Sequence, residues 1–249
     1  MVDVTEFRPG GFRCVPSVFQ YSAGVAALPG YEIRRVRFAR PLPLAEGFAR
    51  AASFITDAGR PLTAFCACEL RSPGPFTEDG FKSFNETYVV TLKEWGLFAD
   101  GLNPVARSNV CPELDPPPVP SFYAFSFTVE AASVPPTAVI AGSGEAREGS
   151  ASYALRTIRF GDTSAEAIRD KARFVLGEME RRLGLLGFGW QDTTRAHVYT
   201  VHDIHRLLIE EMVPRQAGRS GVTWHYARPP VHGLEFEMDC AVLVHEQVT

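Results

Sequence analysis

The two halves of the chain show the same order of predicted elements, and this repeat constrains the fold more than any other feature of the sequence. Short apolar stretches typical of strands alternate with longer amphipathic stretches typical of helices. In each half the order is strand, strand, helix, strand, helix, strand and strand. We therefore predict an α+β fold made of two similar units of about 120 residues each.

The first half follows this order closely. Its second helix carries an apolar stripe formed by Phe84, Tyr88, Leu92 and Trp95. Strands are predicted at residues 19–28, 31–39, 62–70, 106–114 and 121–130, and helices at residues 43–59 and 77–98.

The second half repeats the order. Its long helix, residues 163–187, begins with Thr163 and Glu166 at capping-box spacing and ends at Gly187. The apolar stripe of this helix consists of Ile168, Ala172, Val175, Met179 and Leu183. Strands are predicted at residues 137–146, 153–160, 193–201, 221–227 and 234–244, and a second helix at residues 203–212.

A stretch with two adjacent prolines, residues 130–138, separates the halves. We place the boundary there, with a diverged first unit at residues 1–132 and a second unit at residues 133–249. A tandem duplication is the simplest explanation of equivalent elements on both sides of this join.

The composition excludes several kinds of partner. A net charge of -4 and an isoelectric point near 5.9 offer no basic surface for nucleic acid. No apolar run approaches the roughly 18 residues of a membrane helix, and the N-terminus lacks the pattern of a signal peptide. The five cysteines are odd in number and scattered, unlike a disulfide scaffold. We expect a soluble, cytoplasmic protein that binds neither nucleic acid nor a membrane.

The last predicted strand, residues 234–244, carries acids on one face. Glu235, Glu237 and Asp239 alternate there with apolar residues. If this face meets solvent, the strand is an ordinary amphipathic one. If the face lines a cleft, a partly desolvated Glu237 with a raised pKa suits a general base that activates water.

Two candidates for ligand binding lie in the first half. Arg107 stands near the start of the strand at residues 106–114, where its guanidinium can either bind a carboxylate through two parallel hydrogen bonds or be solvated at a strand edge. In the preceding helix, Phe84 is expected in the core, whereas Asn85 is a poor helix former that offers its amide to a ligand.

The stretch GSGEAREG, residues 142–149, is rich in glycine, but a strand is predicted after it where a dinucleotide-binding loop needs a helix. The backbone N–H groups of Ser143 and Gly144 remain candidates for contacting a ligand. All six histidines fall in the second half, yet their spacing matches no zinc motif. Cys66 and Cys68 are expected to pack in the core. We expect no metal and no cofactor.

Several short motifs resemble the Rid/YjgF family of enamine and imine deaminases. FNETY (residues 84–88) and PVARSNV (residues 104–110) are similar to that family's FN-x-x-Y and PARS-x-V motifs. ARPPVHGLEFEMDCAV (residues 227–242) resembles its closing segment. The likeness extends to 2-aminomuconate deaminases and, more distantly, to chorismatases, which also resemble a tandem of such units.

The resemblance implies a chorismate-mutase-like α+β unit that assembles in threes, with ligand clefts between neighbouring units. It implies that Arg107 clamps a substrate carboxylate and that Glu237 manages the attacking water. Phe84 and Asn85 match the helix that lines the pocket in that family.

The two halves match the family unequally. Ser143 and Gly144 match the turn after the first strand of the unit, and Arg219 matches the second unit's arginine only with an insertion. The first unit has no acid at the matching position of its closing strand, residues 121–130. A chain with one catalytically competent type of cleft and one inactive type would explain why the two halves match the family unequally.

The function implied by the resemblance is a cofactor-free hydrolase that releases ammonia from a small enamine or imine carboxylic acid, such as 2-aminomuconate or 2-aminoacrylate. A homotrimer is expected, because clefts of this kind form between neighbours. Two alternatives stay open: a chorismatase-like hydrolase or lyase, and a non-catalytic ligand-binding module.

Overall fold

Strands and helices alternate along the chain in an order close to the predicted one. The structure, a computed structural model, describes residues 4–98, 101–149 and 151–249. In the first half the strands are β1 (Thr5–Phe7), β2 (Phe12–Val15), β3 (Gly24–Ala27), β4 (Tyr31–Pro43), β5 (Phe65–Arg71), β6 (Ala106–Pro112) and β7 (Ser121–Glu130). The helices of that half are η1 (Arg8–Gly10), α1 (Leu44–Asp57), η2 (Leu62–Ala64) and α2 (Glu78–Glu94).

The second half has shorter strands and one long helix. Its strands are β8 (Ala138–Gly144), β9 (Arg195–Tyr199), β10 (Thr223–His225), β11 (Ala227–Arg228), β12 (Glu237–Val242) and β13 (His245–Val248). Its helices are α3 (Tyr153–Arg156), α4 (Ala165–Leu185), η3 (Trp190–Asp192), α5 (His205–Leu207), the π-helical turn η4 (Leu208–Met212) and α6 (Val213–Arg215).

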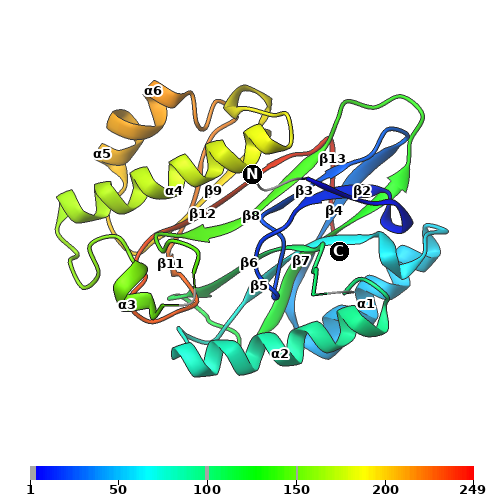
Figure 1. Ribbon diagram of the computed structural model, residues 1–249, viewed down its shortest axis with the longest axis horizontal. Coiled ribbons are helices and arrows are strands. Elements are labelled where there is room, and N and C mark those ends of the chain that lie inside the picture. The colour runs from blue at the N-terminus through cyan, green and yellow to red at the C-terminus, as the bar shows by residue number, and fades with distance from the viewer. Residues whose placement is uncertain (1–3, 99–100, 150) are drawn as a thin grey trace.

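Two β-sheets lie face to face with helices on their outer sides (Figure 1). The strand order is β1-β2-β3-β8-β12-β9-β10 in one sheet, here called sheet 1, and β11-β6-β5-β7-β4-β13 in the other, sheet 2. On α4, Val175 and Met179 pack with Ile140 of sheet 1. Phe48 of α1 and Tyr88 of α2 belong to the core of sheet 2. The mixed α+β class is therefore confirmed.

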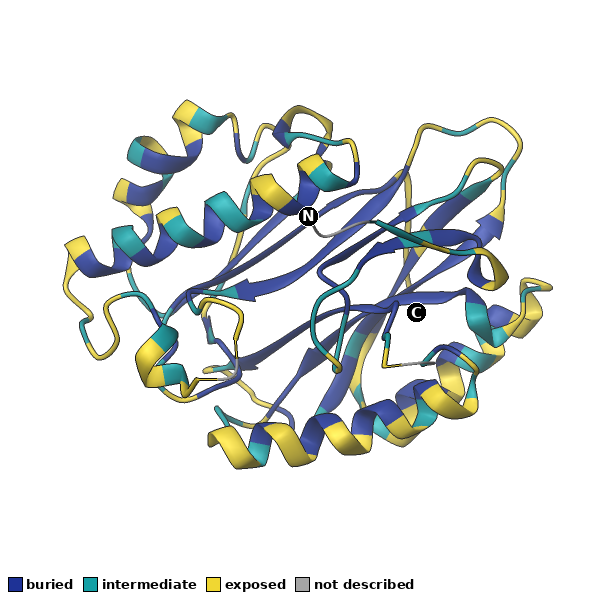
Figure 2. Ribbon diagram, viewed as in Figure 1, coloured by how far each residue is buried: buried dark blue, intermediate teal, exposed yellow. Residues whose placement is uncertain are grey.

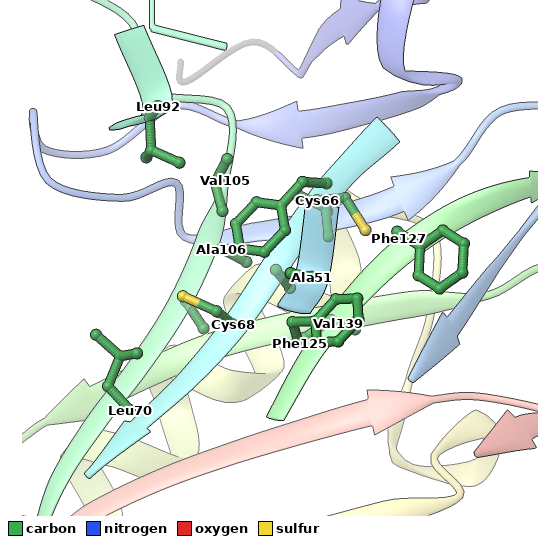
Figure 3. Packing of buried hydrophobic residues seen from close by; sticks show 14 of the residues in the cluster. Ala51, Cys66, Cys68, Leu70, Leu92, Val105, Ala106, Phe125, Phe127 and Val139 are labelled. Atoms are coloured by element: carbon green, nitrogen blue, oxygen red, sulfur yellow. The ribbon is translucent and has the colours of Figure 1, made fainter. Parts of the chain in front are cut away.

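Burial follows these layers. The strands of both sheets are mostly buried, whereas the outward faces of the helices are exposed (Figure 2). Cys66 and Cys68 lie in the core of sheet 2 with Phe125, as expected from their spacing (Figure 3). Among the described helices, none is both long enough and apolar enough to cross a lipid bilayer.

The two sheets exchange strands across the expected boundary. β3 from the first half pairs with β8 of sheet 1, and it carries β2 and β1 with it. In return, β11 pairs with β6, and β13 pairs with β4, in sheet 2. Each sheet therefore contains strands from both sides of the boundary. The division into repeated units at residues 1–132 and 133–249 stays a prediction.

The strand predicted at residues 153–160 is not formed. Residues 153–156 form the short helix α3 instead, and Ile158 donates its backbone N–H to the carbonyl oxygen of Glu145. The reason lies in the exchanged strands: β8 pairs with β12 on one edge and with β3 on the other. Thr157 instead forms an isolated antiparallel bridge with Ala146, just beyond the end of β8.

The predicted helix ends are close to the observed ones, with two differences. The N-cap of α4 is Ser164, whose hydroxyl accepts from the backbone N–H of Ala167, so the capping box predicted from Thr163 is one residue too early. The helix predicted at residues 203–212 begins at His205 and continues through a π-helical turn to Arg215.

Candidate functional site

A cavity of about 580 Å³ opens where the two sheets meet. Its walls come from β6 of sheet 2, from β8 and β12 of sheet 1, and from α2, α3 and α4. The loop at residues 18–21 also lines it, although a strand was expected to begin at Phe19. A cavity of this size suits a small organic ligand.

Arg107 lies on β6 and points its guanidinium into this cavity. The side chain is buried, with 3% exposure, and its charge centre lies 4.7 Å from the ring centroid of Tyr88 and 5.6 Å from that of Phe84. Its Nη1 has no hydrogen-bond partner among the described residues, and no described carboxylate lies within 4 Å of it. A buried cation that lacks a counter-ion is costly, so this position suits an anionic ligand.

Helix α2 brings Asn85 to the same cavity and keeps Phe84 in the core. The helix starts at Thr77, whose hydroxyl accepts from the backbone N–H of Gly80. Asn85 lines the cavity, and its Oδ1 has no partner in the described part of the chain. Phe84 stacks on Phe76 with centroids 5.2 Å apart. It is one of the aromatic side chains that surround Arg107 and does not line the cavity.

Glu237 faces the cavity from the opposite sheet. It begins β12, pairs with Gly144 and Tyr199, and is only 4% exposed; Asp239 is buried as well, so neither of these two carboxyl groups meets solvent. A methyl group on Gly142 would overlap Oε1 of Glu237, so the glycine leaves room for the carboxyl group.

The surroundings of Glu237 raise its pKa well above the ordinary value. Burial is the main cause, and the nearby carboxylates of Asp239 and Glu145 add to it, whereas Arg107 and Arg182 act in the opposite direction. A carboxyl group of this kind can hold a proton near neutral pH and release it during a reaction. The cavity therefore combines a group that binds anions with a group that moves protons.

Ser143 and Gly144 end β8 at the wall of the cavity, within the strand predicted at residues 137–146 and before the turn to which the family resemblance matched them. Arg182, which the sequence did not single out, reaches the same wall from α4. Its Nη1 donates to the carbonyl oxygens of Ala141 and Gly142 at 3.1 and 3.3 Å, and its Nη2 donates to the Ser143 hydroxyl at 3.3 Å. Its spacing could have revealed it, because Arg182 follows Met179 of the apolar stripe by three residues.

Arg219 does not belong to this site. It lies in an exposed turn between α6 and β10, and it is absent from the described lining of the cavity. Of the two arginines considered from the sequence, the structure brings only Arg107 together with Glu237.

The clustered histidines do not form a metal centre among the described residues, where no group of three or more His, Cys, Asp or Glu side chains could hold an ion. His197 and Tyr199 instead take part in a buried polar network around Asp239. Tyr199 donates its hydroxyl to Oδ2 of Asp239 at 2.8 Å, and Ser108 donates to the same oxygen at 2.7 Å. This network joins β6 to β9 and β12 directly behind the cavity.

Comparison with known proteins identifies the family to which the chain belongs. A sequence model of the family described as 2-aminomuconate deaminase CnbZ matches residues 4–247. The 2-amino-5-chloromuconate deaminase of Comamonas testosteroni is 52% identical over 250 residues, which cover 100% of both chains.

Two solved structures are also similar. A chorismatase crystal structure matches 88% of this chain and 77% of its own, with 13% identity and a TM-score of 0.47. E. coli TdcF with bound serine matches 43% of this chain and 80% of its own, with 16% identity and a TM-score of 0.32.

The family match spans nearly the whole chain, and the relative aligns over its full length. The likeness to 2-aminomuconate deaminases expected from the sequence motifs is thus confirmed. The chain belongs to the family described as 2-aminomuconate deaminase CnbZ.

Proposed function

We propose that this protein is a deaminase that hydrolyses the C–N bond of 2-aminomuconate or a close relative, releases ammonia and needs no cofactor. The family match and the 52% identity to a 2-amino-5-chloromuconate deaminase support this class of reaction. The observation that carries the mechanism is that Arg107 and Glu237 face one cavity from opposite sheets.

The reaction needs a proton donor and acceptor beside the carbon that bears nitrogen. A proton added to the unsaturated chain converts the enamine into its iminium tautomer. Water then adds to the C=N carbon and loses a proton, giving an aminoalcohol. Proton transfer to the amino group and loss of the hydroxyl proton break the C–N bond, so that one substrate and one water yield a 2-oxo acid and ammonia.

Glu237 is the residue that we assign to these proton transfers. Its raised pKa lets it begin as the acid that protonates carbon, and the resulting carboxylate then accepts a proton from the attacking water. A second cycle of donation and acceptance releases ammonia and restores the starting state. Arg107 binds the carboxylate next to the reacting carbon and holds that carbon beside Glu237.

We also propose that the two halves derive from one Rid-like α+β unit and that the chain forms a homotrimer. The equivalent order β4-α1-β5-α2-β6-β7 and β8-α4-β9-α5-β10-β12 supports the first part. Light scattering tests the second part, since a mass near three times 27.4 kDa is expected and a stable monomer would contradict it.

The proposed activity is tested by mixing the protein with freshly generated 2-aminomuconate and measuring ammonia with a coupled dehydrogenase. One ammonia per substrate is expected, at a rate far above the spontaneous one, and dialysis against a chelator should leave that rate unchanged. 2-Aminoacrylate serves as the second substrate. Ammonia release no faster than in buffer, with both compounds, would reject the proposal.

A further inference from the structure

The cavity contains a second buried guanidinium whose hydrogen-bonding capacity is only partly used. Arg182 is 2% exposed and lines the cavity, and its Nε has no hydrogen-bond partner among the described residues. A solvated role is therefore excluded for this arginine, and its charge must be balanced locally.

Part of the role of Arg182 is structural. Two residues of β8, Ala141 and Gly142, stand opposite the single residue Asp239 of β12, which makes a β-bulge. Arg182 donates from Nη1 to the carbonyl oxygens of these two residues. Among the described residues, Nη2 has only the Ser143 hydroxyl as a hydrogen-bond partner, so one of its two N–H groups stays available.

The carboxylates near Arg182 do not complete its coordination. Glu148 approaches Nη2 to 3.9 Å and Glu178 approaches Nε to 3.7 Å, and both distances exceed a hydrogen bond. The side chain of Glu148 is 47% exposed and also lines the cavity. An incoming carboxylate can therefore replace Glu148 as the partner of Nη2.

We propose that Arg182 and the Ser143 hydroxyl bind a second carboxylate, so that this site selects dicarboxylates over monocarboxylates. The two arginines reach the cavity from opposite walls, Arg107 on β6 of sheet 2 and Arg182 on α4 behind sheet 1. We expect a linear diacid to bind with one carboxylate at each arginine. This inference rests on the proposed function, because 2-aminomuconate carries a carboxylate at each end.

The surroundings of Glu237 agree with this arrangement. Arg107 and Arg182 are both close enough to lower its pKa against the effect of burial. A diacid held between the two guanidinium groups would therefore lie alongside the carboxyl group that moves protons. Its two charges would also neutralise both buried cations at once.

The test compares two unreactive compounds as competitive inhibitors: trans,trans-muconate and sorbate. They share the same six-carbon diene, and sorbate has a methyl group where muconate has its second carboxylate. We expect the wild-type protein to bind muconate on the order of 10- to 100-fold more tightly, as a charge-assisted pair predicts. Equal inhibition constants for the wild-type protein would overturn the inference.

Two variants test whether Ser143 and Arg182 cause the preference for the diacid. Ser143→Ala and Arg182→Lys should each weaken muconate binding and leave the inhibition constant of sorbate unchanged, so that the preference for the diacid falls. Arg181→Lys, on the outward side of the same helix, is the matched control and should keep the full preference. Arg182→Lys also removes donors to the β8 bulge, so Ser143→Ala decides the outcome if the arginine variant does not fold. A preference that survives in Ser143→Ala and in any folded Arg182→Lys protein would contradict the assignment.

This test separates the inference from the proposed function. If the protein releases ammonia from 2-aminomuconate but does not distinguish muconate from sorbate, the reaction stands and the second anchor is wrong. If muconate binds through Arg182 but no ammonia is released, the anchor stands and the proposed reaction is wrong.

Discussion

Arg107 and Glu237 show how single residues of opposite character share one cavity. Arg107 keeps its charge within a ring of aromatic side chains that cannot neutralise it. Glu237 lies in a buried position that favours its protonated form. The first residue suits binding and the second suits chemistry, so substitutions at the two positions should affect different kinetic constants.

Replacing Arg107 with lysine preserves the charge but removes the planar pair of donors. We expect Arg107→Lys to raise KM about 10- to 100-fold with little change in kcat, because binding of the substrate carboxylate weakens. Arg219→Lys, in the exposed turn, is the control and should be silent. Steady-state kinetics of ammonia release decide this. The opposite pattern, with a silent Arg107→Lys, would place the working cleft elsewhere.

Motifs in the sequence single out Arg107 and Glu237, whereas for Arg182 the sequence offers only its spacing from the apolar stripe. The first two lie in short motifs that resemble a known family, whereas Arg182 lies in a helix rich in exposed charges. Both Lys171 and Arg182 follow apolar residues of the stripe, Ile168 and Met179, by three positions. A charged residue on the buried face of a helix needs a polar partner, and only the structure shows that this partner is Glu145 for Lys171 and the β8 bulge for Arg182.

At the scale of elements, the bulge in β8 shapes the site. The extra residue brings Gly142 close to Glu237 and to Ser108. Arg182 donates hydrogen bonds to the carbonyl oxygens at the bulge. Bulges commonly redirect side chains beside functional sites. Here the bulge creates the space that the carboxyl group of Glu237 occupies.

Filling this space should impair the site. In Gly142→Ala, the new methyl group would overlap Oε1 of Glu237 and would lie 3.2 Å from Cα of Ser108. We expect kcat to fall at least about tenfold, because the carboxyl group must move from its position. Gly177→Ala on α4, where nothing lies within 4 Å, is the control and should be stabilised by about 0.4–1 kcal/mol with full activity. Full activity of Gly142→Ala would show that Glu237 can act from another position.

Most helices and strands were predictable, whereas the short strands β1, β2 and β13 were not. Periodicity located α1, α2, α4 and most strands, because the buried face of each element repeats in the sequence. Strand partners leave no such local trace. The exchange of β3 into sheet 1 could not be predicted, and residues 153–160 form only an isolated bridge, between Thr157 and Ala146, where a strand beside β8 was expected.

At the scale of the whole molecule, buried charges join the two sheets. Arg35 of β4 makes two hydrogen bonds of 2.7 Å to Glu69 of β5 in sheet 2. Arg195 of β9 in sheet 1 lies 3.0 Å from Glu69 and 3.7 Å from Asp239. The carboxylates of Glu69 and Asp239 thus hold Arg195 between the two sheets.

These carboxylates should make the free energy of unfolding depend on pH in the acid range. Burial alone would raise the pKa of Asp239, but His197 and Arg195 lower it to about 2, and Arg195 and Arg35 lower that of Glu69. Their contribution is present above the ordinary carboxyl pKa of about 4 and is lost as the pH falls toward 2.

Asp239→Asn tests this dependence. We expect the variant to lose about 3–5 kcal/mol at pH 7, because it leaves the charge of Arg195 partly unpaired. The difference from wild type should shrink at pH 3, as measured by urea unfolding at both values. Asp57→Asn, at the exposed end of α1, is the control. A difference that does not change with pH would show that Asp239 acts through packing rather than charge.

In the proposed mechanism Glu237 moves the protons of a hydrolytic deamination, and single-turnover release of ammonia from 2-aminomuconate tests this role most directly. Glu237→Gln keeps the shape of the side chain but cannot act as an acid or a base. We expect a rate about 10² to 10⁴ times lower than wild type, with substrate affinity little changed. Full turnover by Glu237→Gln would contradict the role assigned to Glu237.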